Sequence, residues 1–195
     1  MRTGRMEAFS DGVLAIIITI MILEIKVPVS SEFISLKPLL PIVLSYVLSF
    51  IYIGIYWNNH HHMMHTLKHV TGDILWANLH LLFWLSLIPF VTGWIGENEF
   101  AKAPMVLYGI ILLMAAIAYF ILQRRIIRNQ GTGSILSKAI GKDVKGKISP
   151  VLYLAAIGLC WISTWISGIL YVIVAVMWIV PDKRIEVIFR SEEFK

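Results

Sequence analysis

Long uncharged stretches alternate with short polar segments along most of this chain. They extend over 22 residues from Pro38 to Asn59, 23 from Ile74 to Gly96 and 21 from Ala103 to Gln123. At about 1.5 Å per residue, a helix over each stretch is long enough to cross a hydrocarbon core of roughly 30 Å. The pattern therefore predicts an all-α, multi-pass membrane protein.

The first and last stretches depart from this length. The residues from Ile148 to Pro181 form an uncharged run of 34, which is too long for one ordinary span, and a cluster of small polar residues from Ser163 to Gly168 predicts a break into two. Only 12 uncharged residues separate Asp11 from Glu24, so the first helix is poorly suited to face lipid along its whole length. We expect this helix to lie inside a bundle or beside water.

The whole chain, residues 1–195, is predicted to be a single domain of six transmembrane helices. The expected spans are 8–27, 38–60, 73–95, 103–124, 147–163 and 165–181.

Composition and charge support this assignment and orient the chain. Hydrophobic residues make up 58% of the sequence and charged residues 15%, which is too few charges for the surface of a soluble protein. With six spans, 14 of the 17 Lys and Arg residues fall on one side, and Lys26, Lys37 and Lys102 fall on the other. Positive loops stay inside, so we expect a cell-membrane protein with cytoplasmic N- and C-termini. The net charge of +5 is then a loop bias, and nucleic acid is not an expected partner.

The first helix has one continuous apolar stripe. At 100° per residue, Ile16, Ile20 and Leu23 fall within about 60° of one another, and Thr19 lies at the edge of their stripe. Asp11 points to roughly the opposite side. Such a stripe can be a packing face, or it can form a hydrophobic constriction around an axis shared by several subunits.

The same helix carries a motif. Arg5-x-x-x-Phe9-Ser10-Asp11, followed by a run rich in Ile and Thr that ends at Leu23-Glu24, resembles the signature of the transmembrane protein 175 family of potassium channels. Weaker similarities are Trp57-x-x-His60-His61, Asn78, Pro89-Phe90 and Pro181-Asp182. The resemblance covers nearly the whole chain, although the first helix is its most diagnostic part.

The resemblance implies a homotetramer in which the first helices line a central pore. It implies that Ile16, Ile20 and Leu23 form the constriction, that Thr19 contributes to the preference for potassium, and that potassium is the permeant ion. It also implies a structural network that holds the first helix against its neighbours, made of Arg5, Phe9, Ser10, Asp11, Trp57 and His60. A Thr-Val-Gly-Tyr-Gly filter is absent from the sequence, so selection would depend on the hydrophobic constriction.

Histidines cluster after the second predicted span, at positions 60, 61, 62, 65 and 69. Imidazoles spaced by three or four residues share a helix face and could bind a metal. A di-iron desaturase needs about eight histidines and this chain has six, so we expect neither a metal site nor a cofactor. We expect a polar helix end instead, with one or two histidines paired to Asp11 or to the backbone.

Three function classes remain for testing. The preferred one is a potassium-selective channel with a hydrophobic gate, and the alternative is a proton-coupled transporter that uses Asp11 and the histidines. A membrane metalloenzyme is the third. Paired repeats typical of transporters are not visible, and no nucleophile–base set or phosphate loop supports an enzyme. We therefore expect a channel and no enzymatic activity.

Overall fold

The computed structural model describes residues 3–131, 133–140 and 143–179, and every regular element within them is helical. The elements are α1 (Thr3–Leu23), the 3-10 helix η1 (Phe33–Leu39), α2 (Leu40–His65), α3 (Gly72–Ser86), α4 (Ile88–Glu97), α5 (Lys102–Gln130), α6 (Ile135–Ile140), α7 (Val144–Leu159) and α8 (Thr164–Ile179). Pro181-Asp182 and the basic tail that follows lie outside the described residues, as do Arg2 and Lys142.

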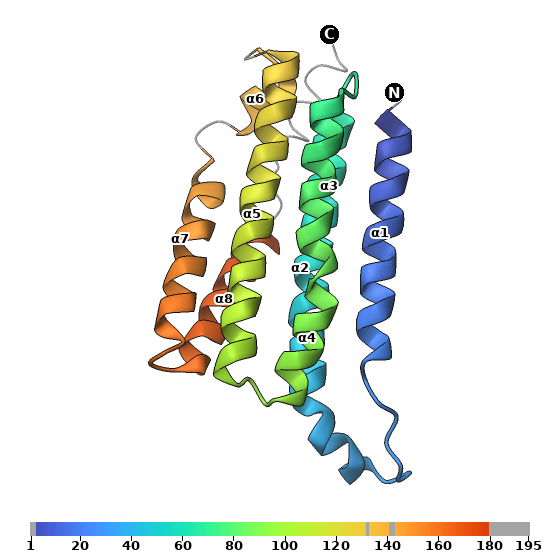
Figure 1. Ribbon diagram of the computed structural model, residues 1–195, viewed down its shortest axis with the longest axis vertical. Helices are drawn as coiled ribbons and strands as arrows, with labels where there is room; N and C mark the ends of the chain where they lie inside the picture. Colours follow the sequence, from blue (N-terminus) through green and yellow to red (C-terminus); the bar gives the residue numbers. More distant parts are fainter. Residues whose placement is uncertain (1–2, 132, 141–142, 180–195) are drawn as a thin grey trace.

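The long helices form a bundle in which α1 and the α7–α8 pair lie on opposite sides (Figure 1). Helix α1 packs against α2, α3 and α4, whereas α7 packs against α5 and α8. Helices α2 to α5 therefore make up the middle of the bundle, and one face of α1 has no partner among the described residues.

Several of these helices suit a membrane by length and apolar composition. Within the described residues, four helical segments qualify, namely Thr3–Leu23, Phe33–His65, Gly72–Glu97 and Lys102–Gln130. Helix α8 is also apolar but is shorter. The protein is therefore a helical membrane protein.

A break separates α3 from α4 at Leu87, inside the uncharged run expected to form one span. Pro89 is at the start of α4. A proline has no N–H to donate, and its ring clashes with the carbonyl four residues earlier, which here belongs to Leu85. Both halves pack against α5, and together they form one apolar segment, Gly72–Glu97, that is long enough for a single crossing.

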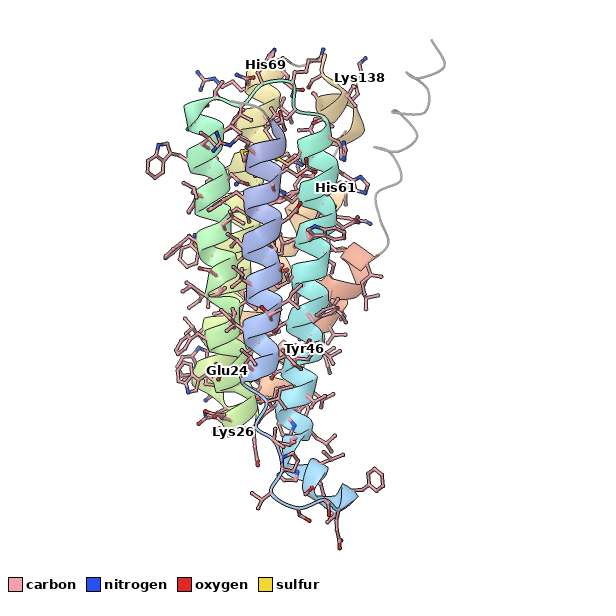
Figure 2. All side chains as sticks on the ribbon, turned by 90° about the vertical axis from the view of Figure 1, so that its right-hand side faces the viewer. Glu24, Lys26, Tyr46, His61, His69 and Lys138 are labelled. Carbon is pink, nitrogen blue, oxygen red and sulfur yellow. The ribbon has the colours of Figure 1, made fainter. Side chains whose placement is uncertain are left out.

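The segments expected on the cytoplasmic side meet at one end of the bundle. The Thr3 hydroxyl donates to the Leu67 carbonyl (3.1 Å), and the Gln130 amide donates to the Thr66 carbonyl (2.8 Å). Figure 2 shows His69 and Lys138 at this end and Glu24 and Lys26 toward the other. The start of α1, the α2–α3 loop and the end of α5 therefore share one end.

Buried tyrosines tie α8 to the middle of the bundle. The Tyr52 hydroxyl donates to the Tyr171 carbonyl (2.6 Å), and the Tyr171 hydroxyl donates to the Met105 carbonyl (3.0 Å). Each bond satisfies a polar group inside an apolar core, where an unpaired hydroxyl would be costly.

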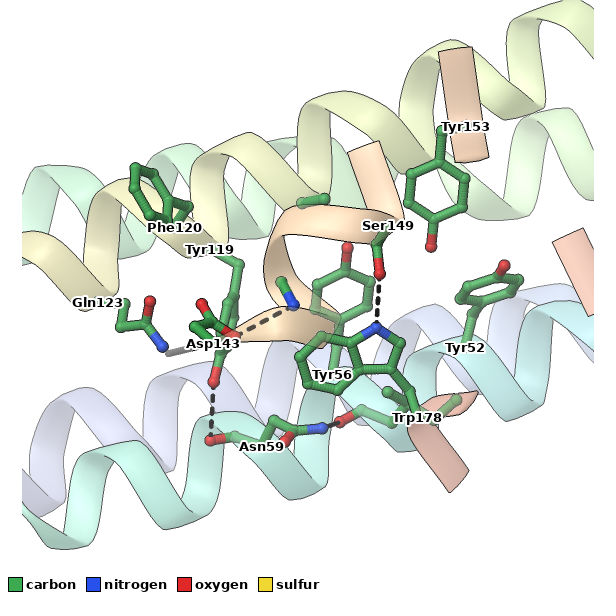
Figure 3. Close-up of a pocket in the computed structure, with 13 residues that line it drawn as sticks. Tyr52, Tyr56, Asn59, Tyr119, Phe120, Gln123, Asp143, Ser149, Tyr153 and Trp178 are labelled. Atoms are coloured by element: carbon green, nitrogen blue, oxygen red, sulfur yellow. Dashed lines mark hydrogen bonds between the residues drawn. The ribbon is translucent and has the colours of Figure 1, made fainter. Parts of the chain in front are cut away.

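A small cavity of about 50 Å³ lies between α2, α5, α7 and α8 (Figure 3). Its polar wall includes Trp178, whose Nε1 donates to the Ser149 hydroxyl (2.8 Å), and Asp143, whose carboxylate accepts from the backbone N–H of Gly146 (3.1 Å). These bonds join the start of α7 to α8 and cap α7. We interpret the cavity as part of the helix packing.

Candidate functional site

Helix α1 has a buried face and an exposed face. The buried residues recur at intervals of three or four, as expected for a helix that packs along one side. They are Met6, Ser10, Leu14, Ile17 and Met21. This face contacts α2, α3 and α4, so it is the side by which α1 is attached to its own chain.

The apolar stripe singled out in the sequence lies on the other side. The side chains of Ile16, Ile20 and Leu23 are 58%, 43% and 80% exposed, and Thr19 is exposed beside them. The Thr19 hydroxyl donates to the Ile16 carbonyl (2.9 Å), so it is satisfied within its own helix. An exposed apolar row of this length must be covered by lipid or by another protein surface.

The stripe borders a wide groove between α1 and α4 of about 700 Å³. Ile16 and Ile20 line it from α1, and Phe90 lines it from α4. Two carboxylates, Glu24 and Glu97, also belong to its wall. Glu97 accepts from the ammonium of Lys26 (3.1 Å), which places an ion pair beside the end of α1. The groove is therefore apolar along its length and charged at one end.

Trp57 connects α2 to α1. Its indole Nε1 donates a hydrogen bond to the Oδ1 of Asp11 (3.1 Å). The structure thus brings together two of the residues assigned to the structural network. The expected pairing of a histidine with Asp11 is not seen among the described residues, where the carboxylate accepts from the Trp57 indole instead.

A second connection is buried and joins three helices. The Nδ2 of Asn78 on α3 donates to the Ser10 hydroxyl of α1 (3.0 Å), and the Oδ1 of Asn78 lies 2.8 Å from the Nε2 of His60 on α2. The Ser10 hydroxyl donates in turn to the Met6 carbonyl (2.9 Å). All three polar side chains are almost fully buried. Asn78 was noted only as a weak similarity in the sequence, yet it is the residue that links the other two.

The remaining network residues lie apart. Phe9 is 54% exposed, and Arg5 is also exposed and makes no hydrogen bond or ion pair with another described residue. The structure therefore brings together Ser10, Asp11, Trp57 and His60 through two separate connections, and it leaves Arg5 and Phe9 on the surface of the single chain.

The histidines take several different partners. His61 Nδ1 lies 3.0 Å from the carboxylate of Glu7, and its Nε2 lies 3.1 Å from the Nε2 of His65. His80 accepts from the Nε1 of Trp84 (3.0 Å) within α3. Sequence reasoning missed Glu7, although this residue is one helical turn before Asp11 and so shares its side of α1.

Comparison with known proteins gives these features a context. The family model described as the endosomal/lysosomal potassium channel TMEM175 matches residues 5–89, which include most of α1 and both connections to it. A potassium channel of Chryseobacterium sp. (strain P1-3) is 56% identical over 186 residues, which cover 95% of this chain and 97% of that relative. A potassium channel of Chamaesiphon minutus is 34% identical over 188 residues, covering 88% of this chain and 91% of the relative.

A solved structure resembles the fold as well as the sequence. It is the crystal structure of a lysosomal potassium-selective channel TMEM175 homolog from Chamaesiphon minutus, which is 32% identical and superposes with a TM-score of 0.80. The match covers 92% of this chain and 97% of that chain. By sequence over nearly its full length and by fold, the protein belongs to the TMEM175 family of potassium channels.

Proposed function

We propose that four copies of this chain form a potassium-selective channel in the cell membrane, with α1 of each copy lining a central ion path. The observation that carries this proposal is the exposed stripe of Ile16, Ile20 and Leu23 on a helix whose other face is buried in its own subunit. Its relatives and its structural neighbour are named as potassium channels. A closed tetramer places the same stripe of every copy around one axis.

The groove beside the stripe favours a pore over a lipid-facing surface. Glu24 and Glu97 belong to the same wall as Ile16 and Ile20. A charged carboxylate is strongly disfavoured in hydrocarbon but is well solvated beside water in a channel mouth, where it attracts cations. A pore axis beside the stripe therefore covers the apolar residues with other subunits and leaves the carboxylates in contact with water.

Selection in this proposal takes place at a hydrophobic neck. Rings of Ile16, Ile20 and Leu23 would narrow the path so that an ion must lose part of its hydration shell, and the hydroxyl of Thr19 lies at the edge of the same stripe. Partial dehydration costs more for the smaller and more strongly hydrated sodium ion than for potassium. A narrow apolar ring can also close the path when water leaves it, because ions cannot pass a dry constriction. The same residues therefore act as the gate.

The two connections to α1 hold the proposed pore helix in register. The bond from Trp57 to Asp11 fixes α1 against α2, and the chain from Ser10 through Asn78 to His60 fixes it against α3 and α2. Hydrogen bonds between helices are a common means of fixing helix positions in apolar surroundings.

We further propose six spans per subunit, with the segments of α7 and α8 as the fifth and sixth. The basic ends of the chain and the basic α5–α7 connection would then share the cytoplasmic side, in agreement with the positive-inside rule. Arg125 and Lys138 lie at the same end of the bundle as the start of α1 (Figure 2).

Ion flux in liposomes tests the proposal. Purified protein in vesicles loaded with KCl should dissipate a potassium gradient passively, and at equal pH on both sides the efflux should generate a membrane potential that is negative inside. A potassium flux that requires a counter-moving proton would support the transporter alternative, and the absence of flux from folded tetramers would contradict both. Chemical cross-linking of the same vesicles should give a ladder that ends at four subunits.

A further inference from the structure

Glu7, His61 and His65 form a cluster at the end of the bundle where α1 begins. The three side chains offer one carboxylate oxygen and two imidazole nitrogens, and these ligand atoms all lie within 4.8 Å of one another. His61 and His65 are one turn apart on α2, whereas Glu7 comes from the first turns of α1. The cluster therefore bridges two helices.

The spacing of the two imidazoles matches that of two ligands on one metal ion. The Nε2 atoms of His61 and His65 lie 3.1 Å apart. Two nitrogens bound tetrahedrally to zinc at about 2.0–2.1 Å are about 3.3 Å apart. An ion can therefore be placed between them with small side-chain movements, in place of the hydrogen bond that the two rings now share.

Glu7 lies where an outer partner of such a site belongs. Its Oε1 is 3.0 Å from the Nδ1 of His61, the ring nitrogen on the far side from His65. A metal-bound histidine usually gives its second N–H to a carboxylate, which fixes the tautomer and makes the ligand more basic. In this arrangement His61 would donate from Nδ1 to Glu7 and keep the Nε2 lone pair for the ion.

We propose that His61 and His65 bind a divalent transition-metal ion of the zinc class through their Nε2 atoms, with Glu7 as the carboxylate partner of His61 and water as the remaining ligands. Borderline nitrogen ligands of this kind suit Zn²⁺, Co²⁺ or Ni²⁺ better than Mg²⁺ or Ca²⁺. His65 is exposed, so the ion has an open route from solvent.

Binding would strengthen the attachment of α1 to α2. The carboxylate of Glu7 is on α1 and both metal ligands are on α2, so the ion and the hydrogen bond that it orders join the two helices. The ring of His61 also stacks on Trp57, with centroids 6.1 Å apart, and Trp57 bonds to Asp11 one turn further along α1. A bound ion would therefore order the first two turns of α1.

Titration calorimetry with ZnCl₂ on the purified full chain tests the site at neutral pH. We expect one ion per chain for the wild type, no binding heat for His65→Ala, and affinity reduced by about 10–100-fold for Glu7→Gln, as is typical when the outer carboxylate is lost. His69→Ala removes an exposed histidine from the same segment but outside the cluster, and should bind as the wild type does.

A cobalt spectrum keeps the test decisive if a variant is unstable. Co²⁺, added as CoCl₂, gives intense visible bands when its coordination is tetrahedral. These bands should appear with the wild type and with His69→Ala, but not with the double variant His61→Ala/His65→Ala. The proposal is overturned if His65→Ala binds zinc with unchanged affinity, or if His69→Ala loses binding as fully as His65→Ala. Metal binding is measured without ion flux, so failure here and failure of the channel proposal are distinguishable.

Discussion

The indole Nε1 of Trp57 lies 3.1 Å from the Oδ1 of Asp11, and this hydrogen bond crosses from α2 to α1. Its indole ring stacks on His61, one turn further along α2. Trp57 therefore makes a polar contact with α1 and an aromatic contact within its own helix. The hydrogen bond and the ring contact can each stabilise the position of Trp57, and only the hydrogen bond reaches α1 directly.

Replacing Trp57 with Phe separates these two contributions. Trp57→Phe keeps an aromatic ring beside His61 but removes the donor to the Asp11 carboxylate. Hydrogen bonds to charged groups contribute roughly 1.5–3 kcal/mol, and this one is partly exposed, so we expect a loss of about 1 kcal/mol. Thermal unfolding in detergent should show a lower midpoint temperature for Trp57→Phe than for the wild type. The loss of helix is followed by far-UV circular dichroism.

Trp76 provides the control for this substitution. It is 75% exposed and makes no hydrogen bond with another described residue. Trp76→Phe should change stability by no more than about 0.5 kcal/mol. Equal shifts for Trp57→Phe and Trp76→Phe would show that the bond to Asp11 adds nothing.

Asn78 is expected to be more sensitive because it serves two buried partners. Asn78→Ala leaves the Ser10 hydroxyl its bond to the Met6 carbonyl but removes the partner of His60 Nε2. The Nδ1 of His60 has no partner among the described residues, so the variant would leave the whole buried imidazole unpaired. An unsatisfied buried polar group costs about 1–3 kcal/mol.

The measurement for Asn78→Ala is again the thermal midpoint, with Asn98→Ala as its matched control. Among the described residues, the Asn98 amide donates to the Trp94 carbonyl alone, at an exposed helix end, so its loss should have little effect. If the two alanine variants unfold at the same temperature, the chain from Ser10 to His60 does not stabilise the bundle.

Charge spacing in the sequence is enough to predict an all-helical membrane protein, because hydrocarbon excludes charges and leaves their positions as boundaries. It does not predict the bend between α3 and α4. Pro89 sits inside an uncharged run whose apolar character is continuous, and the break depends on the clash of its ring with one backbone carbonyl. Hydropathy contains no information on such a contact.

For the candidate site, the sequence predicts which residues share a face of α1, but not which residues of other helices they contact. The periodicity of α1 separates Asp11 from the stripe of Ile16, and in the structure Asp11 bonds to Trp57 of α2 whereas Ile16 lines the groove beside α4. The pairing of His61 with Glu7, where Asp11 was expected, depends on the height at which α2 docks on α1. That height is set by packing across the whole interface, which no local motif encodes.

Gly96 allows α4 to approach α2 closely. A Cβ at this position would lie 2.6 Å from the Cα of Ile42, which is backbone and cannot turn aside. Gly96→Ala must therefore push the two helices apart, and we expect a loss of about 1–3 kcal/mol from overpacking. At Gly158 in α7 the described residues leave the corresponding Cβ position open, so Gly158→Ala should be neutral or slightly stabilising. Thermal midpoints that fall equally for both variants would contradict the close approach.

The proposed neck is tested by making one ring of it polar. Ile16→Asn should let water into the constriction and lower the cost of passing a hydrated ion, so sodium flux should rise toward potassium flux in vesicles. Ile22→Asn is the matched control, since Ile22 is also exposed on α1 (46%) but points about 120° away from Ile16. We expect the control to keep the potassium preference of the wild type. An unchanged ratio of potassium to sodium flux in Ile16→Asn would contradict selection at this ring, and a loss of selectivity in Ile22→Asn alone would place the ion path on another side of α1.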